Sequence, residues 1–262
     1  MFKEITKREF ANGVVYLLHT EDGLPIEVTD TFLPFYTKDA IGRKQNFLDN
    51  KELGSRAERW MIGVSVSSGC PVRCKFCATG NLKHFRNLSS EEIYEQIKFI
   101  LNKHPELNPC DSKEFKINFT RMGDTFLNTE NVKEAIYKIQ AEIPNAHCFI
   151  STIGIKNSDF SWIKDNITLQ LSLHSTDENL RNELIPFKNK MTIEELGKVR
   201  TKSNLKTTIN MTLVHPEDFD INILHKYFDP KHFFIKLSPV NENNISKENN
   251  IGSGIIEGVN LI

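Results

Sequence analysis

This sequence is poor in the features that mark secreted, membrane-spanning or strongly charged proteins. No apolar stretch approaches the roughly 20 residues that a transmembrane helix needs, and the opening Met1-Phe2-Lys3-Glu4 has no apolar run of the signal-peptide type. The formal net charge of the 262 residues is -1, so any nucleic-acid partner would be held by a local patch. We therefore expect a cytoplasmic protein without a membrane partner.

Cysteine is scarce and unevenly placed. Five cysteines are too few and too irregular for a disulfide framework, and three of them, Cys70, Cys74 and Cys77, fall within eight residues. A structural zinc needs four closed ligands, and no second cysteine pair is present. Three thiolates in one loop instead suit a [4Fe–4S] cluster that leaves one iron without a protein ligand. The alternative is a zinc-stabilised, non-enzymatic binding module completed by a residue such as His84.

A dinucleotide-binding G-x-G-x-x-G is also missing after the first predicted strand, which gives a Rossmann fold little support. From Met61 onward, predicted strands alternate with predicted helices. The predicted strands cover residues 64–68, 115–120, 148–151, 168–173, 206–214 and 233–237. Capping boxes at Ser89-x-x-Glu92 and Thr192-x-x-Glu195 mark two helix starts, and further helices are expected over 129–143 and 219–228. The pattern predicts an α/β fold, a partial (β/α)6 TIM-like barrel with a parallel sheet.

The first 62 residues differ from this pattern. Two β-like runs, 13–19 and 26–33, flank the turn signal Glu21-Asp22-Gly23. They predict a short N-terminal β-hairpin extension over residues 1–62, followed by a core barrel over residues 63–262.

Parallel α/β folds bind their ligands where the strands end, and the predicted strand ends carry polar or ligating residues. In chain order these are Cys70, Cys74, Cys77, Gly123, Asp124, Ser151, Ser172, His174, His215 and Asn241. Cys110 and Cys148 are predicted at the opposite edge, so neither is expected to be a fourth cluster ligand. Basic residues gather near the cysteines, as either a solvated rim or a phosphate-binding patch: Arg73, Lys75, Lys83, His84 and Arg86.

The cysteine loop resembles a known family. Its C-x3-C-x2-C spacing, with the aromatic Phe76 before the last cysteine, is similar to the signature of radical S-adenosylmethionine (radical SAM) enzymes. Several motifs resemble more closely the RlmN/Cfr group of RNA adenosine methyltransferases, which have M-G-E-P-L-L-N, S-T-S-G, S-L-H-A and P-I-N-K. The matching stretches here are Met122-Gly123-Asp124-x-x-Leu127-Asn128, Ser151-Thr152-Ile153-Gly154, Ser172-Leu173-His174-Ser175 and Pro186-Phe187-Lys188-Asn189-Lys190.

The resemblance implies a radical SAM barrel, a [4Fe–4S] cluster on Cys70, Cys74 and Cys77, and SAM as cofactor. It implies that Gly123 and Asp124 bind the methionine amino end of SAM. It also implies that Ser151 binds the ribose of SAM. The implied remaining cofactor contacts are Phe76, Ser172, Leu173, His174 and Asn241. His174 and His215 are candidate catalytic residues near the substrate, and an electron donor such as flavodoxin or ferredoxin would be a partner.

Two departures from the RlmN/Cfr pattern bear on the reaction. That group uses a cysteine seven residues before the first cluster cysteine as a base, and here the position is Gly63. No cysteine follows Cys148, although the group methylates one near its C-terminus. We therefore expect hydrogen abstraction from a nucleotide-like or phosphorylated substrate by a 5′-deoxyadenosyl radical. The alternative is RlmN/Cfr-like methylation of an RNA segment by a shortened form or a fragment.

Overall fold

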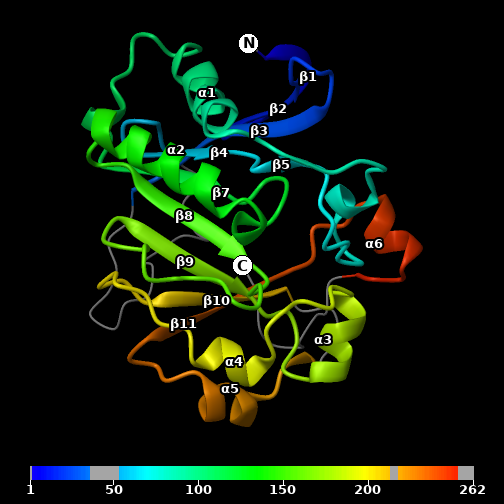
Figure 1. The fold of residues 1–262 in the computed structure, drawn as a ribbon. Coiled ribbons are helices and arrows are strands. Elements are labelled where there is room, and N and C mark those ends of the chain that lie inside the picture. Colours follow the sequence, from blue (N-terminus) through cyan, green and yellow to red (C-terminus); the bar gives the residue numbers. More distant parts are fainter. Residues whose placement is uncertain (1, 36–52, 213–217, 253–262) are drawn as a thin grey trace. The chain divides into compact units, whose positions relative to one another are not determined.

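The computed structural model describes residues 2–35, 53–212 and 218–252 (Figure 1). They form two compact units, each built from several chain segments. The first unit takes residues up to 65 with 88–121 and 130–148, and the second takes 66–87, 122–129 and the residues from 149 onward. The expected boundary between residues 62 and 63 stays a prediction.

The first unit is built on a mixed sheet. Its strands are β1 (Lys3–Phe10), β2 (Gly13–His19), β3 (Pro25–Leu33), β4 (Arg59–Gly63) and β7 (Glu114–Phe119). Strands β1 to β4 pair antiparallel in chain order, and β4 pairs with β7 in parallel. The predicted hairpin is present as β2 and β3. Strand β1 was not predicted because all eight of its residues are exposed and it lacks an apolar run.

Two long helices accompany this sheet. Helix α1 (Ser90–Leu101) starts with the expected capping box of Ser89 and Glu92, and helix α2 spans Thr129–Glu142. Each buries a stripe of aliphatic side chains at helical spacing, such as Ile93, Ile97 and Ile100 in α1. No helix in the described part of the chain is both long and apolar enough to cross a bilayer.

The bounds of the predicted first core strand, 64–68, are wrong: the strand paired with β7 lies earlier, as β4, and within the predicted range only Ser67–Ser68 is a strand, β5. After Gly63 the Ser65 backbone makes hydrogen bonds with a side chain. The Ser65 N–H donates to Gln96 Oε1 at 2.8 Å, and Gln96 Nε2 donates to the Ser65 carbonyl at 3.0 Å. The buried Gln96 amide thus bonds both backbone groups of Ser65, as a neighbouring strand would do. The alternation of apolar residues in the sequence does not reveal such a contact.

Asp30 forms a buried polar centre in the first unit. Its carboxylate is 0 % exposed, and Oδ1 accepts hydrogen bonds from Trp60 Nε1 at 2.8 Å and Arg56 Nε at 3.2 Å. Oδ2 accepts from Arg56 at 2.6 Å and is paired with His104 Nε2 at 2.8 Å. This carboxylate joins β3, β4 and the segment after α1, so its burial is compensated by donors on three sides.

The second unit contains the parallel strands expected for an α/β fold. Its strands are β5 (Ser67–Ser68), β6 (Arg86–Asn87), β8 (His147–Thr152, from Phe149 onward in this unit), β9 (Ile167–Ser172), β10 (Thr207–Thr212) and β11 (Phe233–Ser238). Its helices are α3 (Glu178–Leu184), α4 (Ile193–Gly197), α5 (Ile221–Tyr227) and α6 (Asn244–Glu248). Strand β8 neighbours β9, and β9, β10 and β11 pair in parallel. The predicted capping box at Thr192 and Glu195 opens α4.

Candidate active site at the cysteine loop

The cysteine loop is tightly wound at three points. Gly69 has φ +75°, and a Cβ there would lie 2.0 Å from the His84 carbonyl oxygen. A Cβ on Gly80 would lie 2.7 Å from the Cα of Arg73, which itself has φ 55°. Only glycine fits such close approaches of backbone to backbone. The loop therefore turns back on itself around its thiols.

Cys70, Cys74 and Cys77 are free and partly accessible. Burial raises the pKa of Cys70 to about 12, with added repulsion from Asp124 and Cys77, and burial likewise raises the pKa of Cys74. A bound metal must therefore supply the positive charge that stabilises the thiolates. Within the described ranges, no three His, Cys, Asp or Glu side chains gather around a single point. Three soft ligands on one loop would suit an iron–sulfur cluster.

Helix α6 and its flanks hold the loop from outside. In Figure 1, α6 (red) lies beside the cyan loop segment, and it contacts the 3-10 turn η1 (Ala78–Asn81). Asn243 Nδ2 donates to the Phe76 carbonyl at 2.9 Å, and Asn249 Nδ2 donates to the Lys75 carbonyl at 3.0 Å. The Lys75 N–H in turn donates to the Leu184 carbonyl at 2.9 Å. The backbone between Cys74 and Cys77 is thus fixed on two sides.

We expect Asn243→Asp to loosen a bound cluster. The new carboxylate keeps the acceptor that caps α6 through Ile245 N but loses the donor to the Phe76 carbonyl. Loss of one such bond, worth about 1 kcal/mol, should speed cluster loss to a chelator roughly fivefold. The decay of the visible iron–sulfur absorbance under anaerobic conditions measures this. The matched change Asn222→Asp, on the exposed start of α5, should leave the rate unchanged; equal rates for both variants would contradict a clamping role.

Gly123 and Asp124 form a turn beside Ser67. Gly123 has φ +95°, and a Cβ there would lie 2.1 Å from Ser67 Oγ. Asp124 Oδ1 accepts from Phe126 N at 2.9 Å, and Oδ2 accepts from Ile153 N at 2.8 Å. Burial raises the pKa of this carboxyl to about 6, although those bonds oppose the shift. The carboxylate thus ties the turn to the end of β8, and its contact with the ammonium group of SAM stays a prediction.

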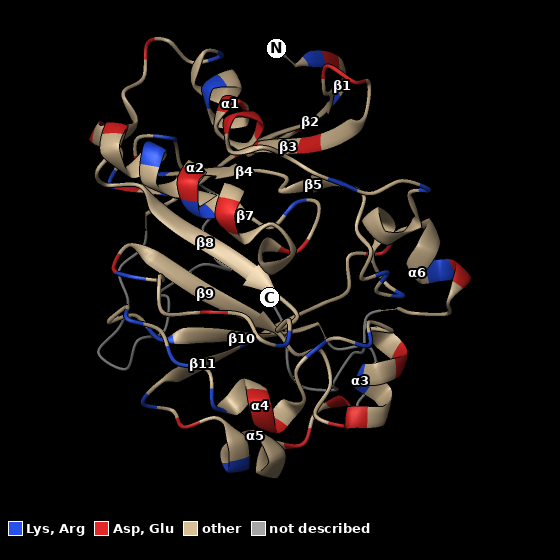
Figure 2. Ribbon diagram, viewed as in Figure 1, with Lys and Arg blue, Asp and Glu red and all other residues tan. Residues whose placement is uncertain are grey.

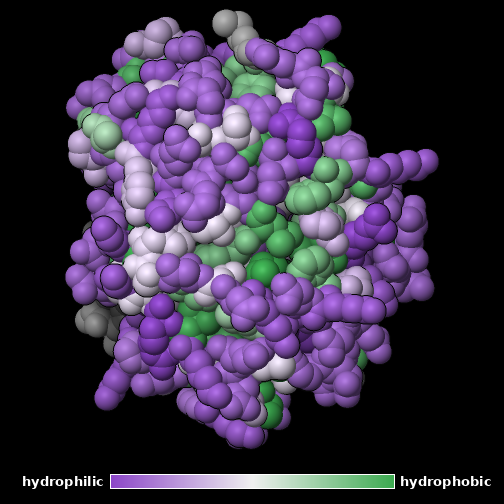
Figure 3. Space-filling model, in the orientation of Figure 1, coloured by the Kyte–Doolittle hydropathy of each residue, from purple (hydrophilic) through white to green (hydrophobic). Residues whose placement is uncertain are grey.

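The two predicted serines come together. Ser151 Oγ, near the end of β8, lies 3.3 Å from Ser172 Oγ, at the end of β9. Two adjacent hydroxyls are suited to the hydroxyl groups of a ribose. The face drawn in Figure 3 carries hydrophobic residues among the hydrophilic ones. Leu173 is fully buried and contributes its N–H to the Asn210 carbonyl, so its side chain belongs to the core.

His174 adopts φ 64°, in the left-handed region that is rare for such a residue. Its ring packs edge-on against Phe76, with 4.8 Å between ring centroids. Its Nδ1 accepts from Thr212 N at 3.0 Å, which assigns the proton of the neutral ring to Nε2. Burial lowers the pKa of His174 to about 3, with a further contribution from Arg181. His174 is therefore a neutral donor at Nε2 here, and a catalytic role stays a prediction.

The two remaining predicted site residues are His215 and Asn241. His215 lies outside the described residues. Asn241 is exposed, and its carbonyl accepts from Asn243 Nδ2 at 3.0 Å. Part of the predicted basic group, Arg73, Lys83 and His84, lines one depression with Cys70. Phosphate binding in that depression stays a prediction, with a solvated rim as the alternative.

Sequence reasoning gave no separate role to Arg181, which is fully buried. One terminal nitrogen donates to the Met191 carbonyl at 2.7 Å and the other to the Ile153 carbonyl at 2.9 Å. Burial lowers its pKa to about 10, while Glu178 and Cys74 oppose that shift. Arg181 thus places a positive charge near Cys74. No local pattern signals this burial, because arginine is seldom enclosed in a protein core.

The sequence that forms this site matches a known protein family. The family model described as "Radical SAM superfamily" matches residues 64–225. The probable dual-specificity RNA methyltransferase RlmN of Dictyoglomus turgidum is 33% identical over 191 residues, covering 71% of this chain and 47% of the relative. The corresponding protein of Koribacter versatilis is 32% identical over 205 residues, covering 76% of this chain and 56% of the relative. The chain thus spans about half the length of the curated relatives it matches.

A solved structure shares the fold. It is a radical SAM methyltransferase from Sphaerobacter thermophilus, with a TM-score of 0.72 and 20% identity, and the match covers 98% of this chain and 71% of that one. At this identity the likeness concerns the fold alone. It agrees with the expected α/β class and its parallel strands.

Proposed function

Since the chain belongs to the radical SAM superfamily, whose members use a [4Fe–4S] cluster and SAM, we propose that Cys70, Cys74 and Cys77 hold such a cluster. When bound, the cluster and SAM supply a 5′-deoxyadenosyl radical for hydrogen abstraction. Because the matched superfamily consists of enzymes, the alternative of a non-enzymatic, zinc-stabilised binding module is not supported. The observation that carries the proposal is the single wound loop that presents three free thiols inside the matched region.

The protein's own contribution is positioning. Asn243 and Asn249 hold the backbone carbonyls of the loop, and the paired hydroxyls of Ser151 and Ser172 are suited to the SAM ribose. We propose a nucleotide-like or otherwise phosphorylated substrate, with an external donor such as flavodoxin or ferredoxin providing the electron. His174 Nε2–H is available to donate a hydrogen bond toward the nucleoside.

RNA adenine methylation is the second candidate, because the curated relatives are RlmN proteins. The position of their base is Gly63 in this chain, and a side chain there would require the side chains of Thr29 and Arg121 to shift. A Cβ at Gly63 would lie 2.3 Å from Thr29 Oγ1 and 2.9 Å from Arg121 Cδ. The local packing therefore supports direct use of the radical over the two-cysteine methylation route.

The test is formation of 5′-deoxyadenosine from SAM and reductant by the anaerobically reconstituted protein. We expect Cys70→Ala, Cys74→Ala and Cys77→Ala each to reduce the product to background and to lower iron content, because each removes one ligand. Cys110→Ala, at an exposed thiol of the first unit, should change neither. Product formation undiminished in all three loop variants would refute the site. Transfer of labelled methyl from SAM to RNA would establish the second candidate instead.

A further inference from the structure

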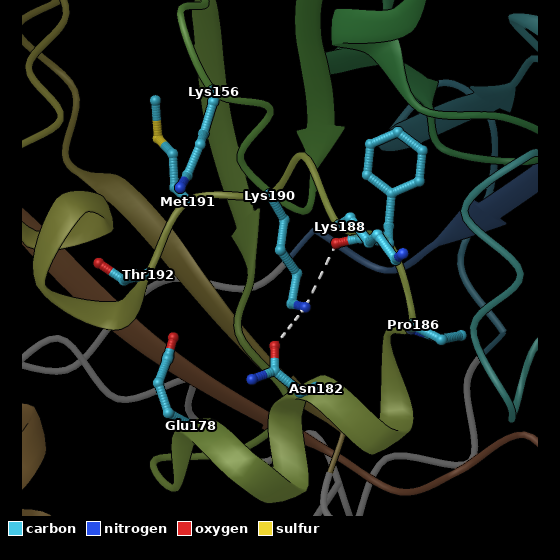
Figure 4. Close-up of a pocket in the computed structure, with 9 residues that line it drawn as sticks. Lys156, Glu178, Asn182, Pro186, Lys188, Lys190, Met191 and Thr192 are labelled. Atoms are coloured by element: carbon cyan, nitrogen blue, oxygen red, sulfur yellow. Dashed lines mark hydrogen bonds between the residues drawn. The ribbon is translucent and has the colours of Figure 1, made fainter.

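A cavity of about 400 Å³ lies in the second unit, within the size range of small-molecule sites. Its wall combines α3, the segment that follows α3, and Lys156 after β8 (Figure 4). Backbone hydrogen bonds fix that wall: Met191 N donates to the Gly154 carbonyl at 2.7 Å, and Lys156 N donates to the Asn189 carbonyl at 3.0 Å. The cavity is thus built on a fixed backbone.

Lys190 is the buried cation of this cavity, with 8% of its surface exposed. Figure 4 shows its side chain reaching toward Asn182, and Nζ donates to Asn182 Oδ1 at 2.5 Å and to the Phe187 carbonyl at 3.3 Å. Both acceptors are neutral, and an ammonium has three donors. One N–H and the full positive charge therefore remain for a ligand. Burial, with repulsion from Arg181, lowers the pKa of Lys190, as expected for an ammonium that lacks an anion in contact.

Two further lysines line the same cavity. Lys156 and Lys188 are exposed, and within the described ranges neither ammonium has a hydrogen-bonded or ion-paired partner. The acidic residue in the lining, Glu178, accepts from Ile193 N at 3.1 Å and lies 3.7 Å from Arg181. Its carboxylate is thus already engaged by Ile193 and Arg181. Along the helices acidic and basic residues are interspersed (Figure 2). Three lysines and one glutamate in the lining of a single cavity are therefore a local excess of about two positive charges.

The cavity lies beside the cysteine loop. The carbonyl of Leu184, at the end of α3, accepts from the N–H of Lys75, between Cys74 and Cys77. A ligand held by the lysines would therefore lie near the proposed reaction centre.

We propose that Lys156, Lys188 and Lys190 bind the phosphate group of a nucleoside monophosphate substrate, an assignment that rests on the proposed function. A phosphate monoester carries about −1.5 to −2 charges at pH 7, which matches the local excess. A phosphodiester in an RNA chain carries only one per phosphate. Phosphate also offers three acceptor oxygens, enough for one ammonium each.

Calorimetric titration of the reconstituted full chain with AMP, adenosine and inorganic phosphate tests this, without SAM or reductant. AMP should bind more tightly than either fragment, and the combined variant Lys156→Gln, Lys188→Gln should weaken AMP binding by about tenfold for each lysine. The control variant Lys164→Gln, Lys202→Gln removes the same charge from exposed positions outside the cavity and should change the Kd by less than twofold.

The outcomes separate the two proposals. Equal weakening in both double variants, or AMP binding no tighter than inorganic phosphate, overturns the nucleotide assignment. Lysine-dependent binding of an oligoribonucleotide without AMP binding overturns it in favour of RNA. Formation of 5′-deoxyadenosine by a protein that does not bind AMP refutes the cavity alone. Lysine-dependent AMP binding by a protein that forms no 5′-deoxyadenosine refutes the proposed function alone.

Discussion

Replacing Asp30 with alanine is expected to lower the free energy of unfolding by about 3–5 kcal/mol, the usual cost of removing one partner from a buried ion pair. The variant leaves Arg56, Trp60 Nε1 and His104 without the carboxylate that receives their hydrogen bonds. Arg56 is partly exposed and can turn to water, whereas the Trp60 side chain is fully buried and cannot. Most of the cost should therefore come from the indole N–H and the lost packing of β3 on β4.

Urea unfolding followed by circular dichroism measures this loss. Asp30→Asn should cost less, because its amide oxygen still accepts from Trp60 Nε1. Glu106→Gln is the control: Glu106 is exposed and lies 3.8 Å from the same His104, so its removal should cost under about 1 kcal/mol. A loss for Asp30→Ala no larger than that of the control would show that the buried network contributes nothing net.

Replacing Arg181 with methionine is expected to cost roughly 3 kcal/mol, since each carbonyl left without its donor costs about 1–3 kcal/mol. The carbonyls are those of Met191 and Ile153. Part of the loss is offset, because Arg181 Nε is buried without a hydrogen-bond partner among the described residues and the variant removes it. The variant should also retain less iron, since the positive charge near Cys74 disappears.

Arg200→Met provides a matched control. Arg200 also donates to two carbonyls, those of Gly197 and Val199, but it is exposed. Water can replace its bonds, so we expect a loss below about 1 kcal/mol and normal iron content. Unfolding by urea and iron measured after dialysis against a chelator give the two readouts. Full iron content in a destabilised Arg181→Met protein would limit Arg181 to a structural role.

Local sequence patterns predicted much of the fold. The capping boxes at Ser89 and Thr192 begin α1 and α4, and the alternating run over Gly13–His19 is β2. These signals act within a few residues, where capping and periodicity decide the backbone. The pattern failed around Ser65, because Gln96, 31 residues away, takes the hydrogen bonds of the Ser65 backbone.

The candidate site was predictable only in part. Glycine and cysteine spacing in the loop, and the serines at strand ends, follow from chemistry that can be read locally. The clamp of Asn243 on Phe76 has no such signal, because its partners are 167 positions apart and the contact is to a backbone carbonyl. The same is true of Arg181, whose burial depends on carbonyls supplied by two other segments. The roles assigned to single residues in binding SAM stay predictions.

The distance along the chain between the loop and its clamp also orders events during synthesis. The three cysteines leave the ribosome well before Asn243 and Asn249, which lie 167 and 174 residues beyond their partners. Chains fold from the N-terminus as they emerge, at about 5–20 residues per second. The loop is therefore without its two asparagine clamps for roughly ten seconds or more after its cysteines have been made.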